Sequence, residues 1–175
     1  MSYASDLLEQ AQHLVRNEPR RPRQASLRRA VSSAYYATFH LLSHEAAGLL
    51  VGAGFGQREM RRLTARVLSH TQMKGACVDL VKPQPSAVIR KRCNDLQLSR
   101  IPEFVRLADS FRELQEERHR ADYDLSTNYI RTEAQISVDQ AAQLFADWKF
   151  LKQFHPEAAY FFALSLFFID AWRKR

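Results

Sequence analysis

The chain has 175 residues, which is enough for one domain to bury a hydrophobic core without disulfide or metal cross-links. Hydrophobic residues make up 46% and charged residues 26%, a balance typical of a globular, water-soluble chain. Five glycines and six prolines argue against a turn-rich β protein and favour helices.

Positive charge is concentrated in the first hundred residues. Residues 1–100 hold 16 Lys and Arg against 7 Asp and Glu, whereas residues 101–175 hold 10 against 12. Arg accounts for 20 of the 26 basic residues, and its planar guanidinium suits phosphates and carboxylates. The bias therefore favours a polyanionic partner such as RNA, although an arginine-rich proteome would produce the same composition.

Neither the cysteines nor the ends of the sequence indicate export, a metal site or a membrane span. Cys77 and Cys93 have no other Cys or His at metal-ligand spacing, so we expect reduced thiols in a cytoplasmic protein without metal or cofactor. MSYASDLLEQ lacks the apolar core of a signal peptide. The apolar run 158–172 contains Asp170 and is short for a transmembrane helix.

The first part of the chain predicts two helices separated by a basic break. Apolar residues at helical spacing predict a helix over residues 3–17, and the prolines of RNEPRRPRQ end it. A second helix is predicted from about Ser26, and its small residues would let another helix approach closely. Its apolar stripe comprises Leu27, Ala30, Val31, Ala34, Tyr35, Thr38, Leu41 and Leu42.

The middle of the chain predicts a turn, a long helix and an irregular segment. The glycines of residues 48–56 are typical of a helix end and turn, because a phosphate-binding loop would carry a lysine after its last glycine. Residues 57–81 are predicted to form one helix. The following KPQPSAVIRKRCN is predicted to be a loop or irregular segment.

Three further helices are predicted in the last part of the chain. The first begins near Pro102, and its apolar stripe comprises Phe104, Leu107, Ala108, Phe111 and Leu114. Residues 137–140 fit a capping box, with Ser137 as N-cap and Gln140 bonding back, and the last helix covers 157–173. No strand pattern or repeat is present, so we predict an all-α bundle of five to seven helices.

The segment QEERHRADYDL, residues 115–125, gathers several residues that could act in chemistry. Arg118 continues the apolar stripe by one turn, so we expect it to be partly buried and ion-paired. Asp122 is four residues further on, and Glu113 and Asp109 are the other local candidates for its partner.

Helical spacing also relates the other members of this segment. Arg112 and His119 would lie within about 20° of each other, two turns apart, whereas Arg118 and Tyr123 would differ by about 140°. We therefore expect His119 to point along a different face from Tyr123.

Two interpretations of the segment are open at this point. A metal-independent ribonuclease needs a base for the ribose 2′-hydroxyl, an acid for the leaving oxygen and a cation for the phosphorane, and one His with one or two Arg supplies these. Alternatively, the ion pairs stabilise a helix end, the ring of Tyr123 packs, and His119 lies in solvent.

Two motifs taken together resemble the HEPN domains of prokaryotes. RRAVSSAYYATFHLL is followed later in the chain by LQEERHRADYD, and one branch of HEPN proteins carries AYYAxFH and R-x-x-ADY helices. The resemblance covers roughly residues 3–154, and the chain departs from the short members after that point. It implies an up-down helical bundle that forms a homodimer, with the motif helices facing each other across the two-fold axis.

The resemblance also implies a chemistry. Many HEPN proteins are ribonucleases, often toxins paired with a minimal nucleotidyltransferase antitoxin, and their signature is an Arg followed a few residues later by a His. If Arg112 is that Arg, His119 fits the spacing, but the ADY sequence favours Arg118, and Tyr123 then stands where the His is expected. A phenol has a reference pKa of about 10 and is a poor general base at neutral pH.

The sequence thus predicts a HEPN-like bundle over residues 1–154 and an apolar helix over 155–175 that packs on the bundle or at the dimer interface. The predicted function is to bind RNA or a nucleotide, with the toxin ribonuclease of a nucleotidyltransferase pair as one form of it; the alternative is a non-catalytic interaction or regulatory protein. Candidate catalytic residues are Arg118, His119, Tyr123, Arg112 and Asp122, and candidate nucleic-acid-binding residues are Arg20, Arg21, Arg23, Arg28, Arg29, Tyr36 and His40.

Overall fold

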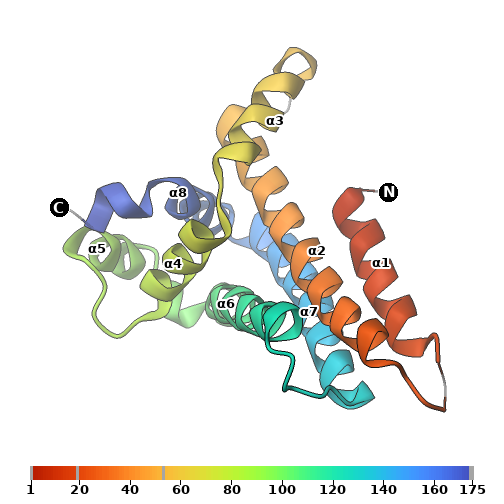
Figure 1. Cartoon of the computed structure of the whole chain (residues 1–175). Helices are drawn as coiled ribbons and strands as arrows, with labels where there is room; N and C mark the ends of the chain where they lie inside the picture. Colours follow the sequence, from red (N-terminus) through yellow and green to blue (C-terminus); the bar gives the residue numbers. More distant parts are fainter. Residues whose placement is uncertain (1, 19, 53, 174–175) are drawn as a thin grey trace. The chain divides into compact units, whose positions relative to one another are not determined.

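The computed structural model describes residues 2–18, 20–52 and 54–173. These residues form eight α-helices and no strand, so the predicted all-α class is confirmed (Figure 1). The helices are α1 (Tyr3–Arg16), α2 (Gln24–Val51), α3 (Arg58–Val67), α4 (His70–Val81), α5 (Ala87–Asp95), α6 (Pro102–Tyr123), α7 (Arg131–Phe154) and α8 (Pro156–Arg173). None of these described helices combines the length and the hydropathy that crossing a membrane requires.

The chain forms two compact units, and each unit is built from two separate stretches of sequence. Unit 1 comprises Met1–Leu41 and Ser110–Phe145, and unit 2 comprises Leu42–Asp109 and Ala146–Arg175. The boundaries fall inside α2, α6 and α7, so each of these helices contributes residues to both units. Residues 1, 19, 53 and 174–175, some of which fall in the predicted break, turn and C-terminal extension, lie outside the described residues.

Unit 1 buries the apolar stripes of its helices. The ring of Tyr35 on α2 lies 5.6 Å from that of Phe111 on α6, and both side chains are fully buried. Burial of such a side chain contributes about 1.5–3 kcal/mol. The other buried residues of this core include Ala11, Leu27, Ala30, Val31, Ala34, Leu114, Ala134, Val138, Ala141 and Leu144.

Arg28 of α2 holds the end of α6 and the segment after it. Its guanidinium donates hydrogen bonds to the carbonyls of Ala121 at 2.8 Å, Asp124 at 2.9 Å and Thr127. The last carbonyls of a helix have no partner within that helix, so this one side chain satisfies acceptors that would otherwise need water. These contacts fix the backbone at the end of the segment 115–125 and just beyond it.

Gln24, one turn before Arg28, clamps the backbone at the other end of the same connection. Its side-chain amide donates to the carbonyl of Tyr129 and accepts from the backbone N–H of Tyr129, both at 2.8 Å. The Tyr129 hydroxyl donates to the carbonyl of Glu117 at 3.2 Å. The connection between α6 and α7 is therefore tied to both α2 and α6.

Asp124, in this connection, should remain charged at acidic pH values at which an ordinary aspartate is already protonated. Its carboxylate accepts hydrogen bonds from the hydroxyls of Ser126 and Thr127, both at 2.6 Å, and these bonds lower the pKa of Asp124 to about 2. We expect carbon-13 NMR titration of the carboxyl group to give this value. The double change Ser126→Ala and Thr127→Val should raise it toward the ordinary pKa of about 3.9; an unchanged midpoint in that variant would exclude the hydroxyls as the cause.

Unit 2 is organised around the packing of α8 on α4. The α8 helix buries Ala158, Ala159, Phe161, Phe162, Ala163, Ser165, Leu166 and Ile169. The side-chain amide of Gln72 on α4 donates to the carbonyl of Phe167 at 3.0 Å. The buried ring of Trp148 on α7 lies 6.0 Å from that of Phe162, so α7 joins the same core.

Residues 57–81 form two helices, and the prediction of one helix is wrong. Leu68 has extended backbone angles, φ −73° and ψ 125°, which end α3. Ser69 then caps α4, because its hydroxyl accepts a hydrogen bond from the backbone N–H of Gln72 at 3.2 Å. No Pro or Gly marks this break in the sequence, so helical periodicity runs straight through it.

The predicted loop KPQPSAVIRKRCN is also corrected, because most of it is α5. Ile89 is buried and anchors this short helix, and Lys91 pairs with Asp95 at 2.9 Å, four residues further on. With only one buried side chain among polar neighbours, the segment has no visible apolar stripe. Residues 57–81 contain α3 and α4 in place of one helix, and α5 is an additional helix. The number of α-helices in the described residues is therefore higher than the predicted five to seven.

The N-terminus of α7 is earlier than the predicted cap at Ser137. The backbone N–H of Ile130 donates to the carboxylate of Glu133 at 3.0 Å, which is half of a capping box in a different register. Ser137 therefore lies buried inside the helix. Gln140 does not bond back to it, but donates to Glu113 on α6 at 2.7 Å.

Candidate functional site at the end of α6

Arg118 is the centre of the polar cluster at the end of α6. Its side chain is only 16% exposed, and its Nε lies 2.7 Å from the carboxylate of Asp122. One terminal nitrogen of its guanidinium donates to the hydroxyl of Tyr36 on α2 at 2.6 Å. The predictions that Arg118 is partly buried and that Asp122 is its partner are confirmed.

The surroundings of Arg118 keep its guanidinium charged. Burial by itself lowers the pKa of this group, but the hydrogen bond to Tyr36 and the charge of Asp122 outweigh it, and the net shift is upward. The guanidinium carbon also lies 6.0 Å from the ring centre of Tyr35, 5.3 Å from that of Tyr36 and 5.6 Å from that of Tyr123. Aromatic faces at such distances attract a cation.

Ser32 is a member of the cluster that the sequence analysis missed. Its hydroxyl, on α2, donates a hydrogen bond to the Asp122 carboxylate. Asp122 thus accepts a hydrogen bond from Ser32 of α2 and forms an ion pair with Arg118 of α6, the helix to which Asp122 itself belongs. The available signal was spacing, because Ser32 is four residues before Tyr36 and lies on the same face of α2.

His119 and Tyr123 form a pair of aromatic rings at the surface. Their ring centres are 5.0 Å apart with planes inclined by 47°, and the Tyr123 residue is 64% exposed. The expectation that His119 points along a different face is wrong, because residues four apart on a helix are neighbours. The predicted angles relate His119 to Arg112 and Tyr123 to Arg118, and they do not include the four-residue spacing between the two rings.

Arg112 lies further from the end of the helix and forms ion pairs with two neighbouring carboxylates. Its guanidinium is 3.1 Å from Glu113 and 3.9 Å from Glu116, four residues further on. Its side chain is 32% exposed. Arg112 is therefore part of the charged face of α6. It lies one turn before Glu116 and two turns before His119.

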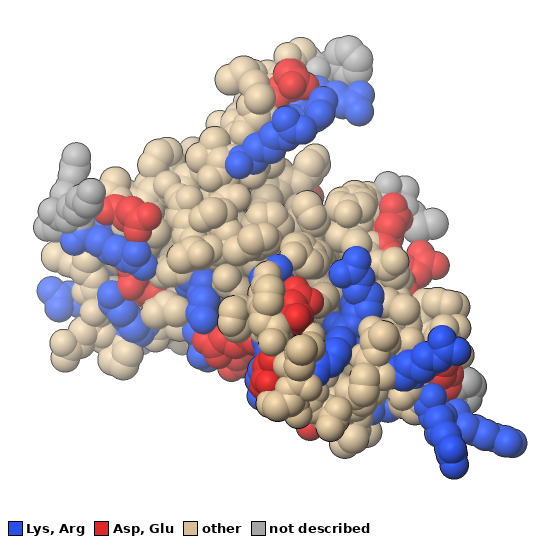
Figure 2. Space-filling model, viewed as in Figure 1, with Lys and Arg blue, Asp and Glu red and all other residues tan. Residues whose placement is uncertain are grey.

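The candidate nucleic-acid-binding residues occupy different environments. In the face drawn in Figure 2, Lys and Arg side chains gather around the segment between α1 and α2. Arg20, Arg21 and Arg29 are exposed, and Arg23 pairs with Glu18 at 3.1 Å. The guanidinium of Arg28 is instead committed to the three backbone carbonyls at the end of α6.

His40 makes contacts of a different kind from those of the arginines. Its ring meets that of Tyr3 edge to face, with centres 4.9 Å apart, and burial lowers the pKa of His40. Of the predicted binding residues, the structure brings Tyr36 into direct contact with a predicted catalytic residue, Arg118.

The fold and this cluster define an all-helical protein with a mostly buried, tyrosine-lined arginine beside two exposed aromatic rings. Within the described residues, no three His, Cys, Asp or Glu side chains converge as a metal ion would require. Comparison of the chain with family models, curated proteins and solved structures found no match.

Proposed function

We propose that this protein is a homodimer of the HEPN type that binds single-stranded RNA or a nucleotide at the end of α6. The exposed ring pair of His119 and Tyr123 beside the charged Arg118 carries the proposal. Unstacked bases are commonly bound between aromatic side chains and arginine, and each stacked base contributes about 1–3 kcal/mol. The exposed Arg20, Arg21 and Arg29 would hold the phosphate backbone.

Binding is favoured over cleavage by the partners of Arg118. A cation that stabilises a phosphorane should meet the developing charge directly, whereas Arg118 is mostly buried, paired with Asp122 and bonded to Tyr36. In addition, Tyr123 occupies the position at which the resemblance expects a His. These points support a dimer that keeps the arginine and lacks the general base.

A metal-independent ribonuclease, in the manner of a toxin paired with a nucleotidyltransferase antitoxin, is the second candidate. The observation in its favour is that His119 is exposed and that its ring contacts Tyr123, which also contacts Arg118, so an imidazole is available to a bound substrate. An imidazole titrates near neutral pH and can accept a proton from a 2′-hydroxyl. Such an enzyme would use His119 in place of the missing base.

Loss of either ring should weaken RNA binding. We expect Tyr123→Leu and His119→Leu each to raise the Kd for a fluorescently labelled single-stranded RNA by about five- to a hundredfold, since each removes a stacking surface. Fluorescence anisotropy measures this. Tyr160→Leu removes another exposed tyrosine, on α8, and serves as the matched control. Equal affinities of all three variants, or an equal loss on duplex DNA, would exclude stacking at this site.

The same protein distinguishes the two candidates when it is incubated with RNA in EDTA. Binding without new RNA ends supports the non-catalytic dimer. Products with 2′,3′-cyclic phosphate ends that disappear in His119→Ala would establish the ribonuclease instead. Light scattering should give twice the 20.3 kDa chain mass for the homodimer, and co-purification with the product of a neighbouring gene tests for the nucleotidyltransferase.

A further inference from the structure

Unit 2 contains a cavity that the proposed RNA site does not use. It has a volume of about 520 Å³ and is lined by the C-terminal end of α4, by α5, and by the start of α6 with the turn before it. Cavities of roughly 300–1,000 Å³ are typical of small-molecule sites. The volume is therefore sufficient for a ligand with a hydrocarbon body.

Most of the cavity wall is apolar, and its charged groups are basic. Val81, Pro85 and Val105 contribute part-exposed hydrophobic surface, and Leu98 and Phe104, which also line the cavity, are almost fully buried. The charged residues among the described lining are Lys82 and Arg90, and no carboxylate joins them there. A ligand that fits this wall has an apolar body and a negative charge.

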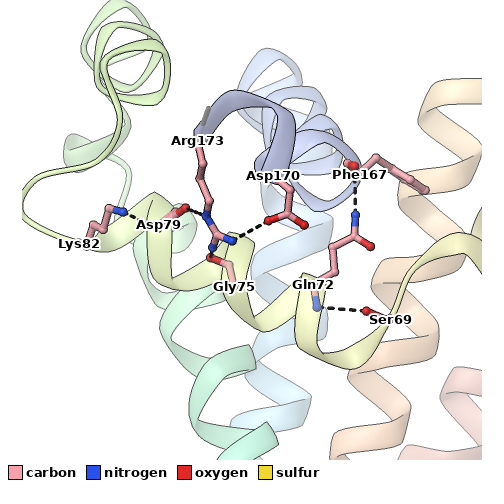
Figure 3. Close-up of polar contacts among 8 residues, drawn as sticks. All are labelled: Ser69, Gln72, Gly75, Asp79, Lys82, Phe167, Asp170 and Arg173. Carbon is pink, nitrogen blue, oxygen red and sulfur yellow. Dashed lines mark hydrogen bonds and ion pairs between the residues drawn. The ribbon is translucent and has the colours of Figure 1, made fainter. Parts of the chain in front are cut away.

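The charge of Lys82 is already neutralised by its neighbours. Its ammonium lies 2.5 Å from the buried carboxylate of Asp79, which also binds Arg173, and Arg173 in turn binds Asp170 at 2.6 Å (Figure 3). Burial by itself raises the pKa of Asp79, but the hydrogen bonds from Lys82 and Arg173 outweigh it and the pKa falls below its usual range. These four groups carry two positive and two negative charges.

Arg90 is thus the excess charge at the cavity. No side-chain hydrogen bond or ion pair joins it to another described residue, and the next residue, Lys91, is paired with Asp95. A guanidinium binds a carboxylate through two parallel N–H groups. A single excess positive charge balances a monoanion, whereas a phosphate dianion would leave one negative charge without a partner.

We propose that this cavity binds a small organic carboxylate with an apolar body. Arg90 receives the carboxylate, and the part-exposed side chains of Val81, Pro85 and Val105 contact the hydrocarbon part of the ligand. The site goes beyond the proposed function at the end of α6, because none of its residues belongs to unit 1. Its test is therefore independent of whether the protein binds RNA.

The alkylation rate of Cys93 reports whether a ligand occupies the cavity, because Cys93 lines it. It is half-buried, while Cys77, the other cysteine, is fully buried, so iodoacetamide should alkylate Cys93 in the folded protein and leave Cys77 intact. Burial raises the pKa of Cys93, so the reaction is run at a pH of about 9 to form the thiolate that displaces iodide. Alkylation of both cysteines together would reveal unfolding, which makes Cys77 an internal control.

Three probe molecules distinguish the contribution of the carboxylate from that of the apolar body of the ligand. We expect saturating 4-phenylbutyrate to slow alkylation of Cys93 by about tenfold, 4-phenylbutanol to bind about ten times more weakly, and inorganic phosphate to give no protection. Isothermal titration calorimetry measures the same binding without the thiol. Equal binding of the acid and the alcohol, protection by phosphate, or no binding of phenylbutyrate would each overturn the proposal.

Two variants of α5 test whether Arg90 is the residue that binds the carboxylate of the ligand. Arg90→Gln should abolish the preference for the acid over the alcohol, whereas Arg92→Gln, an exposed arginine of the same helix outside the cavity lining, should keep it. Circular dichroism confirms that both variants remain helical. An equal loss of preference in both would show a general effect of surface charge and would overturn the role of Arg90.

Discussion

Replacing Trp148 with alanine is expected to lower the free energy of unfolding by about 4 kcal/mol, since large-to-small changes of buried aromatic residues cost about 3–5 kcal/mol. The indole is 2% exposed and its ring lies 6.0 Å from that of Phe162. Its Nε1–H donates to the carboxylate of Glu45 at 3.2 Å. The change therefore removes a large packed ring and leaves an acceptor with one partner fewer.

Urea denaturation followed by far-UV circular dichroism measures this loss, and Trp172 remains as a fluorescent reporter in the same unit. Phe150→Ala, on the same helix but 37% exposed, is the control and should cost about 1 kcal/mol or less. Trp148→Phe should recover most of the loss, because it keeps apolar volume. If Trp148→Ala were no worse than Phe150→Ala, the described packing of α7 with α8 would be wrong.

Arg28→Ala is expected to lower the free energy of unfolding by about 2–4 kcal/mol. Hydrogen bonds from charged groups contribute about 1.5–3 kcal/mol each, and Arg28 donates to three carbonyls. The expected loss is smaller than the sum of three such contributions, because carbonyls near the surface regain water when the side chain is removed. The variant should also loosen the connection between α6 and α7, which hydrogen exchange would detect at residues 124–129.

The control for this variant is the next residue of the same helix. Arg29 is exposed, so Arg29→Ala should change the free energy of unfolding by about 0.5 kcal/mol or less. Arg28→Lys should rescue less than half of the loss, because an ammonium cannot present parallel donors to carbonyls on two sides. Similar stabilities of Arg28→Ala and Arg29→Ala would contradict the bridging role of Arg28.

The sequence predicts the cores of the helices well, because burial leaves a periodic pattern. The stripe predicted from Phe104 to Leu114 is buried throughout. Its extension by one turn correctly indicates that Arg118 is partly buried, and spacing of four residues identifies Asp122 as its partner. These are local properties of one helix, and local spacing is sufficient to find them.

The rest of the site depends on contacts between distant parts of the chain. Arg118 donates to Tyr36, and Asp122 accepts from Ser32, across more than eighty residues of sequence in each case. No periodicity relates the register of α6 to that of α2. The same limit applies to Arg28, whose basic character favours nucleic acid in the sequence and whose guanidinium in fact binds backbone carbonyls.

The sequence does not predict helix boundaries correctly where a single contact determines the end of the helix. Leu68 and Ser69 separate α3 from α4 without a Pro or Gly, and Glu133 caps α7 where the sequence offered a fuller motif at Ser137. The HEPN resemblance and the RNA site stay predictions that the binding and cleavage experiments test.

The division of each unit into two stretches of chain has a consequence for biosynthesis. Unit 1 needs residues up to Phe145, and unit 2 needs α8 at the end of the described chain. Neither unit can therefore be complete before residues up to Phe145 have left the ribosome. Until then the apolar face of α2 lacks its neighbours on α6, so the nascent chain should be a substrate for chaperones that hold exposed helices.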